Sequence, residues 1–282
     1  MLTVTTKSDL RQALQKIRLS DEKIGLVPTM GNLHEGHLRL VRAALAERQY
    51  TVATIFVNPL QFGKNEDLKN YPRSLESDKS LLEETGCDLL FAPDNSEMYG
   101  SAGSIKTSTI VPSLAQNHCG KTRPKHFEGV ATVVTKLFNL ILPHHAYFGL
   151  KDFQQYRIIE QLIADLDFTI QLHGLPIVRE DSGLALSSRN SNLSSKQRLI
   201  APALFQQLQQ TAKLIQQGNQ EFRKVEKDAK HSLKAKGMMP DYFNICDARS
   251  LELASHNDKE LVILAAAFLG DVRLIDNVTL KI

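Results

Sequence analysis

The chain has 282 residues, of which 42% are hydrophobic and 23% are charged, a composition typical of a folded globular protein with one large or two smaller domains. A net charge of +3 argues against a broad nucleic-acid-binding surface, although a small anionic substrate needs only a local cluster of positive charge. The apolar run Leu261–Gly270 is shorter than the roughly 18 residues that a membrane span requires, and it predicts a buried strand.

The cysteines and the N-terminal segment indicate the compartment. Cys87, Cys119 and Cys246 are scattered and form no C-x-x-C pair, which predicts reduced thiols and neither a disulfide framework nor a cysteine-rich zinc site. The N-terminal segment lacks the apolar region of a secretory signal. We therefore expect a cytoplasmic protein.

Strand-like and helix-like patterns alternate along the first part of the chain. Apolar and β-branched runs predict strands at 23–29, 50–59, 87–94, 145–149 and 169–178. Apolar residues three and four apart predict helices at 34–48, 67–86, 129–142 and 153–166, the second closing on Gly86. This order predicts an α/β fold, a Rossmann-like parallel sheet with helices on both faces. Such sheets bind ligands in the loops at the C-terminal ends of their strands.

The composition changes near residue 177. A Gln-rich segment, 194–218, and a charged segment, 222–237, each predict a helix, and strand candidates follow at 241–248, 260–270 and 272–280. We therefore expect a Rossmann-like domain over 1–176 and a smaller C-terminal α+β domain over 177–282. Residues 100–111 are expected to form a surface excursion with edge strands.

The segment TMGNLHEGHL, Thr29–Leu38, joins the first predicted strand to the first predicted helix and allows three interpretations. A zinc site of the H-E-x-x-H type needs histidines four apart, whereas His34 and His37 are three apart with no third ligand nearby. A histidine at a helix start can also be a simple cap. A phosphate site would use free backbone amides, imidazole donors and the close approach that Gly31 and Gly36 permit. Only the phosphate site explains the glycines as well as the histidines.

A second motif, GLALSSRN at 183–190, follows far downstream. Ser187 and Ser188 offer hydroxyl donors and Arg189 a permanent cation, which suits a polyphosphate, although alone the motif is typical of a helix N-cap loop. With the HEGH segment, it resembles the nucleotidyltransferase superfamily, which includes the class I aminoacyl-tRNA synthetases. In that superfamily the second signature is a basic mobile loop that closes over ATP.

Longer segments resemble one family of this superfamily, the pantothenate synthetases (pantoate–β-alanine ligases). The matching segments run in order from residue 27 to residue 277: VPTMGNLHEGHLRLV, TIFVNPLQF, EDLKNYPR, RPKHFEGVATVVTKLFNL, GLKDFQQ, GLALSSRN and AAFLGDVRLIDN. The resemblance implies ATP-dependent condensation of (R)-pantoate with β-alanine through a pantoyl adenylate, releasing AMP and pyrophosphate. It also implies Mg²⁺, a cytoplasmic homodimer, and a C-terminal domain that closes over the active site. No nucleic acid or membrane partner is expected.

The resemblance also implies roles for individual residues. His34 and His37 would contact the phosphates, with His37 as the acid, and Gln61 and Gln155 would hold pantoate in a pocket that Asn58 supports. Gln61 would contact β-alanine as well. The catalytic set implied is His34, His37, Lys151, Ser187, Ser188 and Arg189. The ATP-binding set is Met30, Gly31, Asn32, Leu33, His34, Glu35, Gly36, His37, Gly149, Leu150, Lys151, Asp152, Val178, Leu186, Ser187, Ser188 and Arg189.

The chain departs from the family pattern at three places. Leu150 replaces a glutamate, Glu180–Gly183 reads EDSG in place of Pro-Asp-Gly, and Lys125 replaces a glycine beside Arg123. Arg123 and His126 are expected to be further members of the site. The sequence suggests only Asp78 as a candidate magnesium ligand. From the residues alone, Lys151 could equally be a solvated surface lysine, Gln61 a turn residue and Asp152 a helix cap.

Two other functions remain open at this stage. A class I aminoacyl-tRNA synthetase-like ligase would need a tRNA-binding region after residue 177, where the charges are mixed and form no basic stripe. A nucleotide-binding regulatory protein without turnover is favoured only by Leu150.

Overall fold

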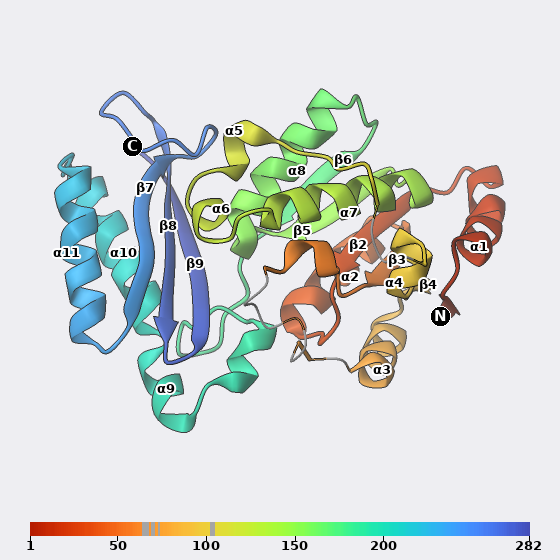
Figure 1. The fold of residues 1–282 in the computed structure, drawn as a ribbon, viewed down its shortest axis with the longest axis horizontal. Helices are drawn as coiled ribbons and strands as arrows, with labels where there is room; N and C mark the ends of the chain where they lie inside the picture. Colours follow the sequence, from red (N-terminus) through yellow and green to blue (C-terminus); the bar gives the residue numbers. More distant parts are fainter. Residues whose placement is uncertain (64–67, 69–70, 73, 102–104) are drawn as a thin grey trace. The chain divides into compact units, whose positions relative to one another are not determined.

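The computed structural model describes residues 1–63, 68, 71–72, 74–101 and 105–282, and the chain divides into two compact units (Figure 1). The first unit comprises Met1–Val111, Arg123–Leu150 and Ile158–Pro176. The second comprises Pro112–Thr122, Lys151–Arg157 and Ile177–Ile282. Two short segments from the first 176 residues therefore belong to the second unit.

A six-stranded parallel sheet forms the centre of the first unit. Its strand order is β1-β4-β3-β2-β5-β6, and every pair of neighbours is parallel. The strands are β1 (Leu2–Val4), β2 (Ile24–Thr29), β3 (Tyr50–Ile55), β4 (Leu89–Phe91), β5 (His145–Gly149) and β6 (Gln171–Leu175). The nearly continuous apolar runs of β2 and β3 suit strands that are covered on both faces. The predicted Rossmann-like sheet is confirmed, with β1 added.

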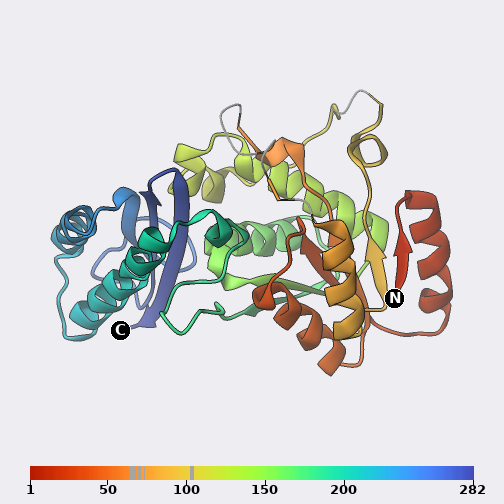
Figure 2. The same cartoon turned by 90° about the horizontal axis from the view of Figure 1, so that it is seen from below.

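Helices of the first unit cover both faces of this sheet (Figure 2). One face is covered by α2 (Glu35–Ala46), which contacts β2, β3 and β5 and carries α3 (Leu75–Thr85) beside it, while α1 (Lys7–Leu19) packs against α7 (His126–Ile141). The unit also includes α4 (Asn95–Tyr99), most of α8 (Phe153–Asp165) and the 3-10 turn η1 (Pro59–Gln61). Gly86 ends α3 with φ of +92°, which confirms the predicted glycine cap.

The second unit has a three-stranded antiparallel sheet of β7 (Met239–Asp247), β8 (Glu260–Leu269) and β9 (Val272–Lys281), in the order β7-β8-β9. Its helices α10 (Ala203–Gln216) and α11 (Phe222–Ala235) pack on each other and on this sheet. Smaller elements are α5 (Pro112–Ala115), α6 (Cys119–Thr122), α9 (Ser195–Ile200) and the 3-10 turn η3 (Ser188–Asn192). The predicted α+β character of this region is confirmed.

Two details of the sequence prediction are wrong. The predicted helix 194–218 is two helices, because Pro202 between α9 and α10 lacks an amide hydrogen and its ring disfavours a continuous helix. No strand lies in the described residues 100–101 and 105–111, where the Thr109 amide donates to Thr132 Oγ1 on α7 (3.0 Å). Part of the predicted helix 67–86 and of the EDLKNYPR segment lies outside the described residues.

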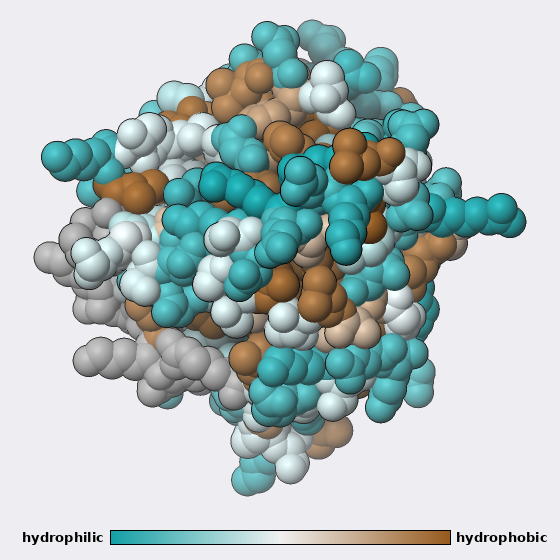
Figure 3. Space-filling model, turned by 90° about the vertical axis from the view of Figure 1, so that its right-hand side faces the viewer, coloured by the Kyte–Doolittle hydropathy of each residue, from teal (hydrophilic) through white to brown (hydrophobic). Residues whose placement is uncertain are grey.

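Within the described part of the chain, no helix is both long and apolar enough to cross a membrane. Figure 3 shows one face of the molecule, on which apolar residues lie in separate groups among hydrophilic ones. Such scattered apolar groups are ordinary for a folded protein surface.

Candidate active site

Three neighbouring strands of the first unit lead into predicted site segments. β2 is followed by the loop to His34 and α2, β3 by Asn58 and η1, and β5 by Leu150, which begins the 3-10 turn η2 (Leu150–Asp152). Parallel neighbours end at the same edge of a sheet, which is where such folds bind ligands. The structure therefore brings His34, His37, Gln61 and Gly149 to one edge of the sheet.

The two histidines form a reciprocal cap at the start of α2. His34 is the N-cap residue, and its Nδ1 accepts a hydrogen bond from the Gly36 amide (3.1 Å). His37 Nδ1 accepts from the His34 amide (3.4 Å), and the two ring centroids are 4.2 Å apart. A nitrogen that accepts carries no proton, so these hydrogen bonds assign the proton of both neutral imidazoles to Nε2. Each ring therefore has its N–H donor opposite the nitrogen that faces the helix backbone.

This geometry confirms the cap interpretation, and it leaves fewer backbone amides for a bound phosphate. The first-turn amides of His34, Gly36 and His37 already have partners inside the protein, and the His37 amide donates to the His34 carbonyl at 2.8 Å. The expectation of free backbone amides is therefore wrong for His34, Gly36 and His37, and it stays a prediction for Glu35. Binding of an anion by the two imidazole side chains stays a prediction.

A carboxylate from α3 holds the loop that carries the histidines. Asp78 is 2% exposed, and its two oxygens accept hydrogen bonds from the Asn32 and Leu33 amides, each at 2.8 Å. Gly31 has φ of +81°, and a β-carbon there would lie 3.0 Å from Asp78 Oδ2. Both oxygens are engaged by backbone, so Asp78 does not fit the role of magnesium ligand. It is a loop-holding residue that sequence reasoning did not recognise.

Other residues of the loop have separate tasks. Leu33 is buried in the core beneath α2, so its side chain belongs to the packing of the unit. Glu35 is exposed and pairs with Arg42 on the same helix. A β-carbon at Gly36 would lie 2.9 Å from two atoms of the His34 ring, so glycine is needed for the ring to reach back over the first turn.

Gln61 lies beside the histidine loop and is 8% exposed. Its Oε1 accepts from Asn58 Nδ2 (3.0 Å), and its Nε2 donates to Met30 Sδ (2.9 Å). Met30 follows β2 and Gln61 follows β3, so this contact joins two predicted site segments. Gln61 does lie in a turn, as the alternative interpretation had it, and its buried side chain also contacts the histidine loop.

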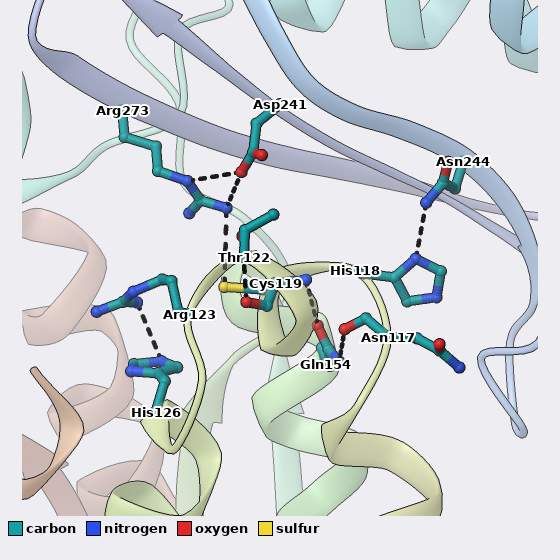
Figure 4. A network of polar contacts seen from close by, with 10 residues as sticks. All are labelled: Asn117, His118, Cys119, Thr122, Arg123, His126, Gln154, Asp241, Asn244 and Arg273. Carbon is teal, nitrogen blue, oxygen red and sulfur yellow. Dashed lines mark hydrogen bonds and ion pairs between the residues drawn. The ribbon is translucent and has the colours of Figure 1, made fainter. Parts of the chain in front are cut away.

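Arg123 and His126 hold the backbone of η1. The Gln61 carbonyl accepts from His126 Nδ1 (2.8 Å) and from Arg123 Nη2 (3.4 Å). Arg123 Nη1 lies 3.1 Å from His126 Nε2 (Figure 4). Because a carbonyl can only accept, the His126 proton is on Nδ1, and Nε2 is left to accept from the guanidinium. The two residues thus fix the position of Gln61, and direct contact with a substrate stays a prediction for them.

Lys125 occupies a backbone conformation that favours glycine. It is the N-cap of α7 with φ of +68°, and it stands where the family resemblance expects glycine. We predict that Lys125→Gly raises the free energy of unfolding by about 0.5–1 kcal/mol, because glycine adopts this conformation without the clash of a β-carbon. Urea unfolding checks this. Lys125→Ala keeps the β-carbon but removes the charge, so an equal gain from alanine would contradict the backbone explanation.

The predicted site residues from Lys151 onward belong to the second unit. A hairpin joins two of them, Val178 and Leu186. The Leu186 amide donates to the Val178 carbonyl (2.9 Å), and Arg179 pairs with Ala185 in an antiparallel bridge. Gly183 closes the turn with φ of +91°. The EDSG departure therefore still makes a tight turn, with glycine at the left-handed position.

The polar loop after this hairpin begins η3. Ser187 is its N-cap, and its Oγ accepts from the Arg189 amide (3.3 Å). The N-cap interpretation of the SSRN motif is therefore confirmed, and it is compatible with a phosphate-binding role because η3 still carries Ser188 and Arg189. Asn190, 4% exposed, donates to the Ala185 carbonyl (3.0 Å) and so ties the loop to the hairpin.

Lys151 and Asp152 lie on η2, and their side chains are 3.6 Å apart. Asn277 Nδ2 on β9 donates to the Lys151 carbonyl (3.0 Å), which fixes this turn in the second unit. Of the neighbouring glutamines, Gln154 is buried and donates to the Leu114 and Asn117 carbonyls, both at 2.8 Å. Figure 4 shows the contact with Asn117. Gln154 is thus structural, while Gln155 is only half-buried.

Sequence reasoning missed a strong ion pair beside Val178. Arg179 makes a two-pronged contact with Asp276 (2.6 and 2.9 Å), and its guanidinium lies 3.5 Å from the centre of the Phe205 ring. Asp276 is 5% exposed, so this is a largely desolvated pair with good geometry. The segment AAFLGDVRLIDN, which contains Asp276 and Asn277, was the available signal.

The cysteines of this chain are buried, and two of them have raised pKa values. All three cysteines are buried and free, and burial raises the pKa of Cys87 to about 11 and of Cys246 to about 12. These two thiols are therefore protonated at neutral pH and are poor nucleophiles. Among the residues that the structure describes, no three or more His, Cys, Asp or Glu side chains gather to hold a metal ion.

A parallel sheet with a histidine-capped helix and an amide pair at the edge where such sheets bind ligands is typical of α/β enzymes that bind nucleotides. A family model described as pantoate-beta-alanine ligase matches residues 2–279. The chain belongs to the pantoate–β-alanine ligase family.

Curated relatives and solved structures agree. The chain is 49% identical over 280 residues to a pantothenate synthetase of Marinobacter nauticus, with 99% of both chains covered. It is 50% identical over 282 residues to one of Pseudomonas putida, covering 100% of this chain and 98% of the relative. A pantothenate synthetase structure from Thermus thermophilus has a TM-score of 0.92 at 42% identity, with 99% of each chain covered. A Francisella tularensis pantoate-beta-alanine ligase complexed with beta-gamma ATP and beta-alanine has a TM-score of 0.84 at 31% identity, covering 99% of this chain and 97% of that one.

Proposed function

We propose that the chain condenses (R)-pantoate with β-alanine to pantothenate, using ATP and releasing AMP and pyrophosphate through a pantoyl adenylate. Family membership over nearly the whole length supports this activity. The observation in the molecule that carries this proposal is the hydrogen bond between Gln61 and Met30. It joins a side-chain amide suited to a hydroxy acid to the loop whose two histidines cap α2.

The first step joins a pantoate carboxylate oxygen to the α-phosphorus of ATP and breaks the bond from that phosphorus to pyrophosphate. Negative charge builds on the phosphate oxygens, and donors aimed at it lower the barrier. His34 and His37 supply Nε2–H groups for this purpose. We assign the remaining donors and cations of this step to Lys151, Ser187, Ser188 and Arg189, with Asp152 and the Val178 backbone on the nucleoside.

The second step is the attack of the β-alanine amine on the acyl carbon. The new C–N bond replaces the C–O bond, AMP leaves with that electron pair, and the nitrogen gives up a proton to solvent. Gln61 and Gln155 are assigned to pantoate, because neutral amides both donate to and accept from a hydroxy acid without a strong ion pair. An amine that arrives deprotonated needs no further base.

Magnesium enters this proposal as part of the nucleotide substrate. Bound with the nucleotide, the ion would neutralise phosphate charge and keep several waters, so it would need few protein ligands. That is consistent with the engagement of both Asp78 oxygens by backbone amides. We further propose a cytoplasmic homodimer in which domain 177–282 closes over the bound substrates.

AMP release tests the activity directly. With ATP, magnesium, pantoate and β-alanine, we expect AMP to appear, and omitting pantoate or β-alanine should reduce it to background. Pyrophosphate exchange into ATP should depend on pantoate and not on any of the standard amino acids, because adenylation precedes the amine. Amino-acid-dependent exchange would contradict the proposal in favour of a synthetase-like ligase, and ATP binding without AMP release would favour a regulatory protein.

A further inference from the structure

A short chain of side chains runs from α4 to Gln61. Tyr99 ends α4 and is 3% exposed, and its hydroxyl donates to Asn58 Oδ1 at 2.6 Å. Asn58 Nδ2 in turn donates to Gln61 Oε1 at 3.0 Å. The Tyr99 ring is held by an edge contact with Phe56, with 5.7 Å between ring centroids, and by Lys136 Nζ at 5.9 Å from its centre.

Backbone partners fix which end of the Asn58 amide is which. The Leu60 amide can only donate, and it points at Asn58 Oδ1 (3.2 Å). The Gly129 carbonyl can only accept, and it faces Asn58 Nδ2 (3.0 Å). The atom that Tyr99 contacts is therefore the oxygen, so the tyrosine donates. Burial raises the pKa of Tyr99, which keeps that hydroxyl protonated.

The orientation of Asn58 determines that of Gln61. Both hydrogens of Asn58 Nδ2 are used, one on Gly129 and one on Gln61, so the Gln61 atom on this side is its oxygen. The NH₂ group of Gln61 then faces the Met30 sulfur, a weak acceptor. An oxygen of a bound hydroxy acid is a stronger acceptor and would take that hydrogen bond.

We propose that Tyr99 is a positioning residue that, through Asn58, holds Gln61 as a hydrogen-bond donor toward the hydroxy-acid substrate. Tyr99 itself touches no substrate in this scheme. The inference rests on the proposed function for the identity of the substrate, but the orientation of the Gln61 amide rests on the hydrogen bonds alone.

Tyr99→Phe tests this role. It removes one hydroxyl and leaves the longer Leu60 hydrogen bond to hold Asn58, so the KM for pantoate should rise roughly five- to tenfold while the KM for ATP stays within about twofold. In a Gln61→Ala background the same substitution should add nothing to the KM for pantoate, because the side chain that it positions is gone. An unchanged KM for pantoate, an equal rise for ATP, or additive effects would overturn the proposal.

Tyr147→Phe is the matched control. Tyr147 is also buried in the first unit, and its hydroxyl donates to another side-chain amide oxygen, Gln49 Oε1 (3.0 Å). Its removal should cost stability in thermal unfolding much as Tyr99→Phe does, but should leave the KM for pantoate unchanged. An equal rise in that KM in both variants would make the effect of Tyr99 merely structural.

A readout independent of activity separates this inference from the proposed function. The side-chain NH₂ signal of Gln61 in ¹H–¹⁵N NMR spectra of the full chain, assigned by its loss in Gln61→Ala, should shift and broaden in Tyr99→Phe but not in Tyr147→Phe. If the wild type releases no AMP with pantoate, the proposed function fails while this result still decides the positioning role. An unperturbed Gln61 signal in Tyr99→Phe would overturn it.

Discussion

Replacing His37 by alanine is expected to lower kcat by about 10²–10³-fold while leaving the fold intact. The substitution removes an Nε2–H donor that the cap orients, and we have proposed that this donor stabilises the negative charge that builds on the phosphate oxygens during adenylation. It also removes the acceptor of the His34 amide, so a loss of about 1 kcal/mol in unfolding free energy is expected as well. Steady-state turnover and urea unfolding, measured on the same preparation, check both expectations.

His37→Gln separates the cap from the chemistry. Glutamine at the third position of a helix accepts from the N-cap amide, so it should restore the stability that alanine loses. We expect it to recover only a small part of turnover, because its amide does not occupy the place of the imidazole Nε2–H. His34→Ala should behave like His37→Ala. Near-wild-type turnover in either alanine variant would remove these histidines from the ATP step.

The sequence could predict which segments meet at the ligand-binding edge of the first sheet, because the patterns that identify them are local. The run that becomes β2, the glycines after it and the helical spacing from His34 onward all lie within a few residues of one another. Parallel topology then brings the ends of β2, β3 and β5 together without further information. The end of α3 at Gly86 could be predicted for the same reason, because a glycine cap is also a local pattern.

The side-chain roles that could not be predicted from the sequence depend on contacts between distant segments. Asp78 can hold the histidine loop only because α3 lies against that loop at Asn32. In the sequence alone, the same carboxylate is equally compatible with a metal ligand. The amide order of Asn58 and Gln61 depends on the Gly129 carbonyl of α7. The break at Pro202 is different, since its signal was present in the sequence and the Gln-rich helical pattern outweighed it.

Gly129→Ala is expected to lower the free energy of unfolding by about 2 kcal/mol and to raise the KM for pantoate. A β-carbon at this position of α7 would lie 2.4 Å from the carbonyl carbon and oxygen of Leu60, and 2.6 Å from the Gln61 amide nitrogen. These are backbone atoms, so η1 as a whole would have to move away from the helix. Gln61 moves with η1, and the Gly129 carbonyl that orders Asn58 becomes misplaced. Urea unfolding and the pantoate dependence of AMP release measure the two effects.

The sign of this change is diagnostic, because alanine normally stabilises a helix by about 1 kcal/mol relative to glycine. Glu128→Ala, one position earlier on α7, introduces the same residue type away from the contact with Leu60 and should stay within about 0.5 kcal/mol of the wild type. If Gly129→Ala were instead more stable than the wild type with an unchanged KM for pantoate, the close approach of α7 to η1 would not constrain the pocket. A loss of stability with the KM for pantoate intact would place the constraint on folding alone, and Gln61 would then keep its position despite the shift of its own backbone.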